Sequence, residues 1–193
     1  MACIALTKGR GLDCSRSSSG IKYVYFAVYD EVISTTLSGT AGILELTDID
    51  MGENTLYRYA MPLGTASLSD SITGSRENGT IFYTPSLTLI LNKLTKEDQN
   101  QVKLLGQSKV IIFAQLNATL ASGNDVIVAL GTVNGMELNA GTMDSGSDWA
   151  SRGGYTLTFD GMEAMPFPMV ADYDTGGVPF DNSVFTLGTI VES

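Results

Sequence analysis

A strict two-residue alternation between residues 66 and 73 constrains this chain more than any other feature. One set of positions is mainly apolar: Ala66, Leu68, Asp70 and Ile72. The intervening set carries only hydroxyl side chains: Ser67, Ser69, Ser71 and Thr73. Successive side chains of a β-strand point to opposite faces, whereas a helix repeats every ~3.6 residues. The segment is therefore predicted to be a half-buried strand with a smooth hydroxyl face.

Strand-like patterns recur along most of the chain, separated by turns rich in Gly, Asn, Asp and Ser. Further strands are predicted at 21–30, 42–50, 55–61, 80–91, 110–117, 125–133, 136–140 and 155–160, and a strand or extended tail at 184–191. Residues 21–30 and 110–117 are apolar or aromatic on both faces, which indicates that both faces are covered. Pro85 lacks a ladder donor and favours an edge position or a bulge.

These patterns predict a mainly β chain. Many short strands with turns every ~8–12 residues are typical of an antiparallel β-sandwich or small barrel. One short α-helix is expected at about residues 95–106. Thr95 has the side chain of an N-cap, Asp98 follows three residues later as in a capping box, and Gly106 suits the position beyond the helix end. The helix is mostly polar, so it is expected on the outside of a sheet.

Composition divides the chain into three parts. They are an extended N-terminal arm at 1–20, a β-sandwich domain at 21–171 and a C-terminal extension at 172–193. The arm is rich in Gly and Ser, and Gly9, Gly11 and Gly20 are among its residues. Such a composition predicts irregular backbone.

The absence of histidine from the sequence limits the chemistry of the chain. It removes the Ser-His-Asp and Cys-His triads, the commonest general base and the commonest metal ligand. Cys3 and Cys14 are too few for a structural zinc site. They are expected to be free thiols in a reducing cytoplasm, with a disulfide as the alternative. We expect no metal or cofactor, and we predict that the chain is not an enzyme.

Two acidic patterns bear on this prediction. Glu45 with Asp48 or Asp50 has the chemistry of a glycosidase carboxylate pair, but nothing in the sequence places the two groups around one cleft. With 21 acidic residues, such pairs arise by chance. The run 172–177 is similar to a fragment of a calcium loop but lacks the EF-hand spacing, so a polar turn is expected.

The chain is acidic, with a net charge of −10 and a pI of about 4.3. Its 11 Lys and Arg residues are scattered, which disfavours specific binding of nucleic acid. Charged residues make up only 17%, below the ~25% of a typical soluble domain, which indicates surface covered by other subunits. No signal peptide is recognised and no apolar run reaches the ~20 residues of a membrane helix, so synthesis in the cytoplasm and no membrane partner are expected.

Three segments, taken in order, resemble the plan of phage tail tube proteins, the major tail protein family. The first is Gly20-Ile21-Lys22-Tyr23-Val24-Tyr25-Phe26, which follows a small-residue arm. The second is residues 87–114, with a long strand, an outer helix and then Val110-Ile111-Ile112-Phe113-Ala114. The third is residues 155–167, with Tyr155-Thr156-Leu157-Thr158-Phe159-Asp160-Gly161-Met162-Glu163 and then Met165-Pro166-Phe167. The likeness covers most of residues 20–170.

The resemblance implies a structural protein of the virion, made in the host cytoplasm. It implies homo-oligomeric rings, expected to be hexameric, that stack into a tube beside other tail or head–tail proteins. DNA would pass through the lumen without specific binding. No functional residue carries over from the family, because its members work through surface shape and charge.

Residue-level expectations come from this chain alone. The lumen face is predicted to be the hydroxyl set Ser67, Ser69, Ser71 and Thr73. The subunit interface is predicted at Trp149, Gly9, Gly11 and Gly20, although Trp149 could instead cap a local core. Two alternatives stay open. One is another virion part, namely a capsid decoration protein, a head–tail completion protein or a short-tail ring. The other is a carbohydrate-binding β module that would use the tyrosines at 23, 25, 29, 57 and 59.

Overall fold

Strand β1 (Ile21–Val28) is central to the computed structural model because its side chains are apolar on both faces. Val24 and Phe26 point into one hydrophobic core, whereas Tyr25 and Ala27 point into a second core on the opposite face. The alternation along one strand therefore holds two cores apart, as the sequence predicts.

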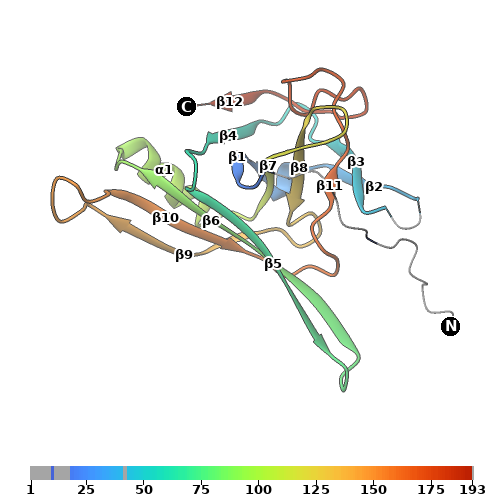
Figure 1. Ribbon diagram of the computed structural model, residues 1–193, viewed down its shortest axis with the longest axis horizontal. Helices are drawn as coiled ribbons and strands as arrows, with labels where there is room; N and C mark the ends of the chain where they lie inside the picture. The colour runs from blue at the N-terminus through green and yellow to red at the C-terminus, as the bar shows by residue number, and fades with distance from the viewer. Residues whose placement is uncertain (1–9, 11–17, 41–42, 193) are drawn as a thin grey trace.

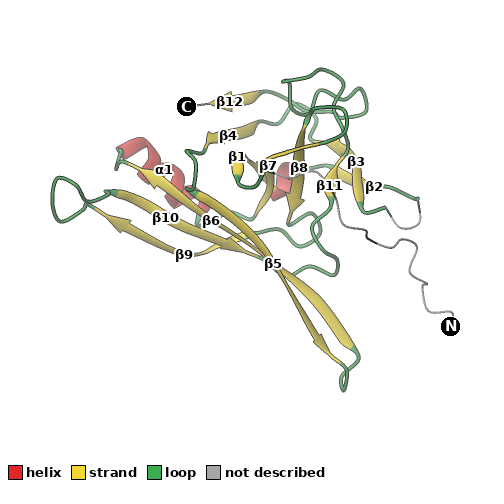
Figure 2. Ribbon diagram, in the orientation of Figure 1, coloured by secondary structure: helices red, strands yellow, loops and turns green. Residues whose placement is uncertain are grey.

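Two open sheets form the described part of the chain, which comprises residues 10, 18–40 and 43–192 (Figures 1 and 2). The eight-stranded sheet has the order β12 (Ile190–Glu192), β4 (Leu56–Ala60), β1, β7 (Val110–Thr119), β8 (Asp125–Leu130), β11 (Met169–Val170), β3 (Glu45–Asp50) and β2 (Ser34–Leu37). The four-stranded sheet has the order β5 (Ala66–Ser75), β6 (Thr80–Asn92), β10 (Gly154–Asp160) and β9 (Glu137–Asp144). A 3-10 turn (Tyr29–Glu31) and helix α1 (Lys96–Leu105) complete the elements.

The mainly β architecture with one short helix is confirmed, as an open sandwich rather than a closed barrel. The smaller sheet is antiparallel throughout. The larger sheet is mixed, because β11 runs parallel to β3 and β12 runs parallel to β4. Parallel neighbours must be joined by long connections, and both of these pairs bring the end of the chain back to strands near its beginning.

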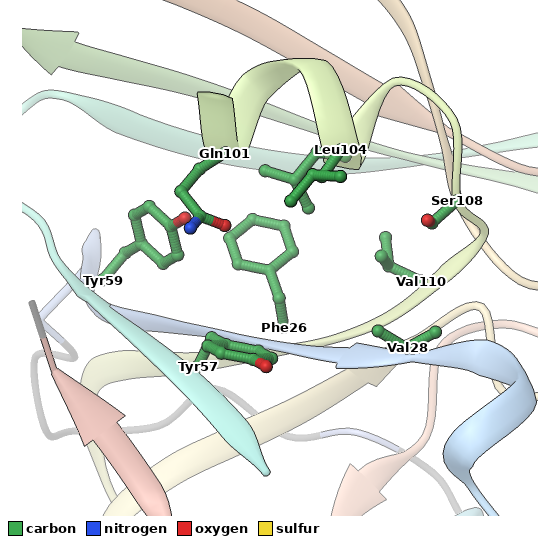
Figure 3. A pocket seen from close by; sticks show the side chains of 9 residues that line it. Phe26, Val28, Tyr57, Tyr59, Gln101, Leu104, Ser108 and Val110 are labelled. Atoms are coloured by element: carbon green, nitrogen blue, oxygen red, sulfur yellow. The ribbon is translucent and has the colours of Figure 1, made fainter. Parts of the chain in front are cut away.

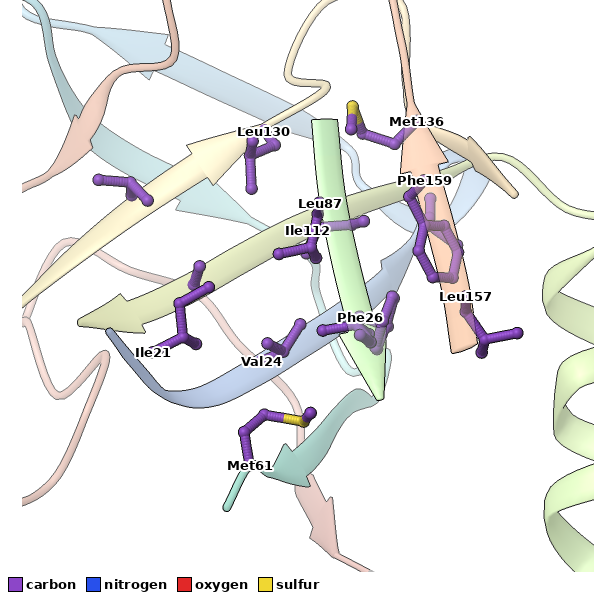
Figure 4. Packing of buried hydrophobic residues seen from close by; sticks show 14 of the residues in the cluster. Ile21, Val24, Phe26, Met61, Leu87, Ile112, Leu130, Met136, Leu157 and Phe159 are labelled. Atoms are coloured by element: carbon purple, nitrogen blue, oxygen red, sulfur yellow. The ribbon is translucent and has the colours of Figure 1, made fainter. Parts of the chain in front are cut away.

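The first core lies between the two sheets (Figure 4). The larger sheet contributes alternate side chains of β1 and β7, including Phe26 and Ile112. The smaller sheet contributes Leu87 and Leu89 from β6 and Phe159 from β10. The Phe26 and Phe159 rings meet across the layers with centroids 5.2 Å apart. These contacts fix which face of the smaller sheet points inward.

The second core is covered by the C-terminal segment, which the sequence sets apart as an extension. Tyr173 and Phe180 are buried there. The Phe180 ring packs edge-on against Tyr25 and Phe113, with centroids 5.1 and 5.3 Å away. A Cβ at Gly188 would lie 2.2 Å from the Asn54 carbonyl oxygen, so only glycine allows this close approach. Residues after 171 thus complete the fold of the described chain.

A buried polar relay crosses the larger sheet beside this core. The Tyr25 hydroxyl donates to Gln115 Oε1 (2.7 Å), and Gln115 Nε2 donates to Asp125 Oδ2 (2.7 Å). Lys22 Nζ pairs with the same carboxylate at 2.5 Å. Burial raises the pKa of Tyr25 to about 12. The relay therefore requires a neutral tyrosine, and the buried Gln115 amide is hydrogen-bonded through both its oxygen and its nitrogen.

Helix α1 begins where the sequence predicts. Thr95 accepts a hydrogen bond from the Asp98 backbone N–H (3.0 Å), and its hydroxyl donates to the Asp98 carboxylate (2.7 Å). Gly106 ends the helix with right-handed backbone (φ −73°), rather than the left-handed conformation typical of a residue beyond the C-cap. Val102 and Leu105 pack against the first core, so the helix lies on the outside of the sandwich.

Pro85 lies at the point in β6 where one neighbour ends. The ladder with β10 stops at the Asp160–Ser86 pair, and Gly161 N–H then donates to the Pro85 carbonyl (3.3 Å). The pairing with β5 continues past Pro85 to Thr80. The pairing resumes in the same register at the Tyr83–Glu163 bridge, so Pro85 interrupts the ladder on the β10 side and does not lie at the free edge expected from the sequence.

We expect Phe180→Ala to lower the free energy of unfolding by about 3–5 kcal/mol, because it removes a buried ring from the second core. Val184→Ala is the matched control, since Val184 lies in the same segment but is 56% exposed. Urea denaturation of both variants measures the difference. Equal, small losses for the two variants would show that the C-terminal segment contributes little to stability.

We expect Tyr25→Phe to weaken folding near neutral pH by about 1 kcal/mol, since Gln115 loses its donor. The pKa of Tyr25 is raised on folding, so its contribution is complete below the ordinary tyrosine pKa of about 10. That contribution is lost as the pH rises through about 12. Stability curves between pH 8 and about 12 should therefore fall less steeply for the variant than for the natural chain. Parallel curves would contradict this assignment.

Candidate assembly surfaces

The outer face of the four-stranded sheet is covered with hydroxyl groups. The inner face of this sheet packs on the first core, so cross-strand partners of the serines in β5 share the outer face. The set consists of Ser67, Ser69, Ser71, Thr73, Thr84, Ser86, Thr88, Thr142, Thr156 and Thr158. The hydroxyl oxygens of Thr88 on β6 and Thr158 on β10 are 3.4 Å apart. The predicted hydroxyl strand is thus one row of a wider hydroxyl-rich face, on which the register also places the apolar residues Phe82, Ile90 and Ala140.

Charge is sparse on this hydroxyl face. Within the four described strands its charged side chains are acidic: Asp144, Asp160 and Glu137, the partner of Asp160, and all three lie at strand ends. Lys109, which lies outside these strands, pairs with Glu137 (3.3 Å). Arg152 reaches it from a loop and donates to the Thr156 hydroxyl (2.9 Å). Ser67, Ser69 and Ser71 are exposed. The face therefore offers many weak hydrogen-bonding groups and little attraction for phosphate.

Both edges of the same sheet are unpaired within the described residues. Strand β5 pairs only with β6, and β9 pairs only with β10. Along β6, Ile90 N–H points to Thr65 on the β5 side (2.7 Å), and Tyr83 N–H points to Glu163 on the β10 side (2.9 Å). Alternate residues of a strand bond to opposite neighbours. The register then places outward-facing backbone groups at Leu68, Asp70 and Ile72 on β5 and at Gly141 and Met143 on β9.

The hairpin of β5 and β6 projects beyond the body of the molecule (Figure 1). Its turn runs from Arg76 to Gly79, with Gly79 at φ +63°. The core-facing side of the hairpin continues past the core as Ile72 and Ile81, which are 67% and 60% exposed. The apolar side of the hairpin thus extends beyond the part that the rest of the chain buries.

Trp149 lies in a loop between β9 and β10 that is held by its own hydrogen bonds. Asp148 Oδ1 accepts from the backbone N–H groups of Ala150 (3.0 Å) and Ser151 (2.9 Å) and from the Ser151 hydroxyl (2.9 Å). The Ser151 hydroxyl and these N–H groups lower the pKa of Asp148. The indole of Trp149 is fully exposed. It therefore does not cap the core of its own chain, and its role as an interface anchor stays a prediction.

The glycines of the N-terminal arm are placed only in part. Gly9 and Gly11 lie outside the described residues. Gly20 adopts φ +102°, and its carbonyl accepts from Asn117 N–H (3.0 Å). A Cβ at Gly20 would lie 3.0 Å from Asn117 Nδ2. Gly20 therefore fastens the start of β1 to β7, and its part in a subunit interface stays a prediction.

An open apolar pocket under helix α1 was not expected from the sequence (Figure 3). Its volume is about 190 Å³. The helix contributes Gln101, Leu104 and Leu105, the strands contribute five further side chains, and Ser108 lies at one end. The strand side chains are Phe26, Val28, Tyr57, Tyr59 and Val110. Strand contacts from β1, β4 and β7 give no local sequence signal, so this pocket becomes visible only in the fold.

The chemical candidates are dispersed or already bonded. Asp50 Oδ1 accepts from Gly52 N–H (2.9 Å) at the end of β3, and Asp172 Oδ1 accepts from Asn124 Nδ2 (2.7 Å) and Tyr173 N–H (3.0 Å). Hydrogen bonds from Ser122 and Asn124 lower the pKa of Asp172. Across the described ranges, no group of three His, Cys, Asp or Glu side chains is arranged to hold a metal ion.

The tyrosines considered for sugar binding do not form one exposed platform. Tyr25 is buried, and the Tyr23 ring lies 4.9 Å from the Arg58 guanidinium carbon. Tyr57 is exposed, while Tyr29 and Tyr59 are half-buried. Tyr57 and Tyr59 instead line the pocket under α1.

No helix among the described residues is long and apolar enough to cross a membrane. No protein-family model, curated protein or solved structure matches the chain.

Proposed function

We propose that this chain is a structural subunit of a bacteriophage virion, most specifically a tail tube protein that assembles into stacked rings around a DNA conduit. The observation that supports this best is the four-stranded sheet. It has one face on the core, one hydroxyl face and two free edges. In this proposal the chain is made in the host cytoplasm and resides in the phage tail.

The opposite directions of the two edge strands are compatible with a closed ring. The order β5-β6-β10-β9 is antiparallel at every step, so β9 runs opposite to β5. If β9 of one copy lies beside β5 of the next, the antiparallel ladder continues without a break. Such a contact uses two different surfaces of each copy and closes a ring when the rotation allows it. It also covers edges that would otherwise invite uncontrolled pairing. Sixfold symmetry rests on the family resemblance alone.

The hydroxyl face suits the lumen of such a ring. Phosphate binding depends on clustered Lys and Arg, and the four strands present none on this face in the described chain. The net charge of −10 adds weak repulsion. DNA would form only weak hydrogen bonds with the hydroxyl groups and would not bind tightly. Passage of DNA through the tube requires such weak binding.

The projecting hairpin supports stacking. Its apolar side, Ile72 and Ile81, leaves the body of its own subunit and needs cover. In a tube the neighbouring ring supplies that cover, and at the tube ends other tail or head–tail proteins do so. The partners are therefore further copies of this chain first and terminal proteins second.

Edge pairing can be tested with Met143→Pro. Met143 is 61% exposed, and its N–H points away from β10, so proline should remove a donor from the free edge while leaving the fold intact. We expect rings or tubes for the natural chain and for Met143→Ala in electron micrographs, and small species for the proline variant. A natural chain that stays strictly monomeric at high concentration would contradict the proposed function.

The lumen assignment can be tested in phage that carry Ser67→Lys, Ser69→Lys and Ser71→Lys together. Added cations on this face should attract phosphate and slow DNA ejection, while tubes still assemble. The same three positions changed to Gln provide a bulky, uncharged control. Ejection at the normal rate from particles with all three lysines would remove these residues from the lumen.

A further inference from the structure

We propose that Trp149 of one copy inserts into the pocket under α1 of a second copy. This inference rests on the self-assembly proposed above and adds to it a specific contact. It joins two features that the single chain leaves unexplained, namely an exposed aromatic side chain on an ordered loop and an empty apolar pocket open to solvent.

The loop presents Trp149 without needing to fold on binding. Asp148 accepts three hydrogen bonds from Ala150 and Ser151, and Asp144 Oδ1 accepts from Gly146 N–H (2.9 Å). Lys93 N–H donates to the Gly153 carbonyl (2.9 Å) and ties the loop to the end of β6. Rigid aromatic anchors of this kind carry much of the binding energy in protein interfaces, because little conformational entropy is lost.

The pocket fits an indole in shape and chemistry (Figure 3). Its volume of about 190 Å³ is large enough for an aromatic ring, since an apolar cavity of ~150 Å³ in another protein holds benzene. Aromatic and aliphatic groups from Phe26, Tyr57 and Leu104 line it, and aromatic pairs favour such contacts. Gln101 and Ser108 supply oxygen atoms that can accept the indole N–H, which is a donor only.

Position favours a second copy as the occupant. The loop and the start of α1 lie at the same end of the sheet, since Gly154 pairs with Asn92. When β9 of one copy lies beside β5 of the next, the loop is at the end of the sheet from which the next copy's α1 begins.

Trp149 is the only tryptophan, so its fluorescence reports the contact directly. We expect its emission to move to shorter wavelength over the concentration range in which sedimentation shows assembly. Leu104→Arg should abolish the shift and raise the concentration needed for assembly by about tenfold. Leu94→Arg is the matched control, because Leu94 (46% exposed) resembles Leu104 (48%) but lies outside the pocket lining.

Trp149→Ala provides a second test that carries little folding risk, since the indole makes no buried contact in its own chain. Sedimentation should show the same weakened assembly as Leu104→Arg. Rings that form while the emission stays that of a water-exposed indole would overturn this contact and leave the proposed function standing. A short-wavelength emission that does not depend on concentration would place Trp149 in the pocket of its own chain. Absence of any assembly would overturn both proposals.

Discussion

The fold depends on burying both faces of the central strands β1 and β7. Six consecutive residues of β7, from Val110 to Gln115, are buried. A strand that is apolar on both sides needs a cover on each. The four-stranded sheet covers one side, and the C-terminal segment with Phe180 covers the other. The sandwich thus has a third, thinner layer, and the relay of Tyr25, Gln115 and Asp125 links strands β1, β7 and β8 of the larger sheet.

Local signals predicted most of the longer elements, but they did not predict β2 and β11 or the neighbours of each strand. The alternation at residues 66–73 and the cap at Thr95 each depend on a few adjacent residues, and both appear in the structure. The pairing of β11 with β3 and of β12 with β4 involves strands of two and three residues. Strands this short show no periodicity, and their partners are more than a hundred residues away. The burial of Phe180, at φ +65°, has no sequence signal either.

Some of the candidate surfaces can be recognised from local sequence, and others only from the fold. The row Ser67, Ser69, Ser71 and Thr73 was evident from the sequence, and the exposure of these residues agrees with it. The wider hydroxyl-rich face needed the register that aligns Thr88 with Thr158. The free edges needed the strand order, and the pocket under α1 needed side chains from three strands and a helix. Surfaces made from distant segments are properties of the topology.

The outer part of the β5–β6 hairpin has a mechanical consequence. Beyond Tyr83, which still bridges Glu163, β6 has only β5 beside it, so the outer hairpin is a two-stranded ribbon attached to a four-stranded sheet. Two-stranded ribbons twist more freely than wider sheets. In the proposed tube, the four-stranded sheets would keep the shape of the lumen, while the two-stranded ribbons would flex between successive rings. A filament built in this way can curve under load while its inner wall keeps its shape.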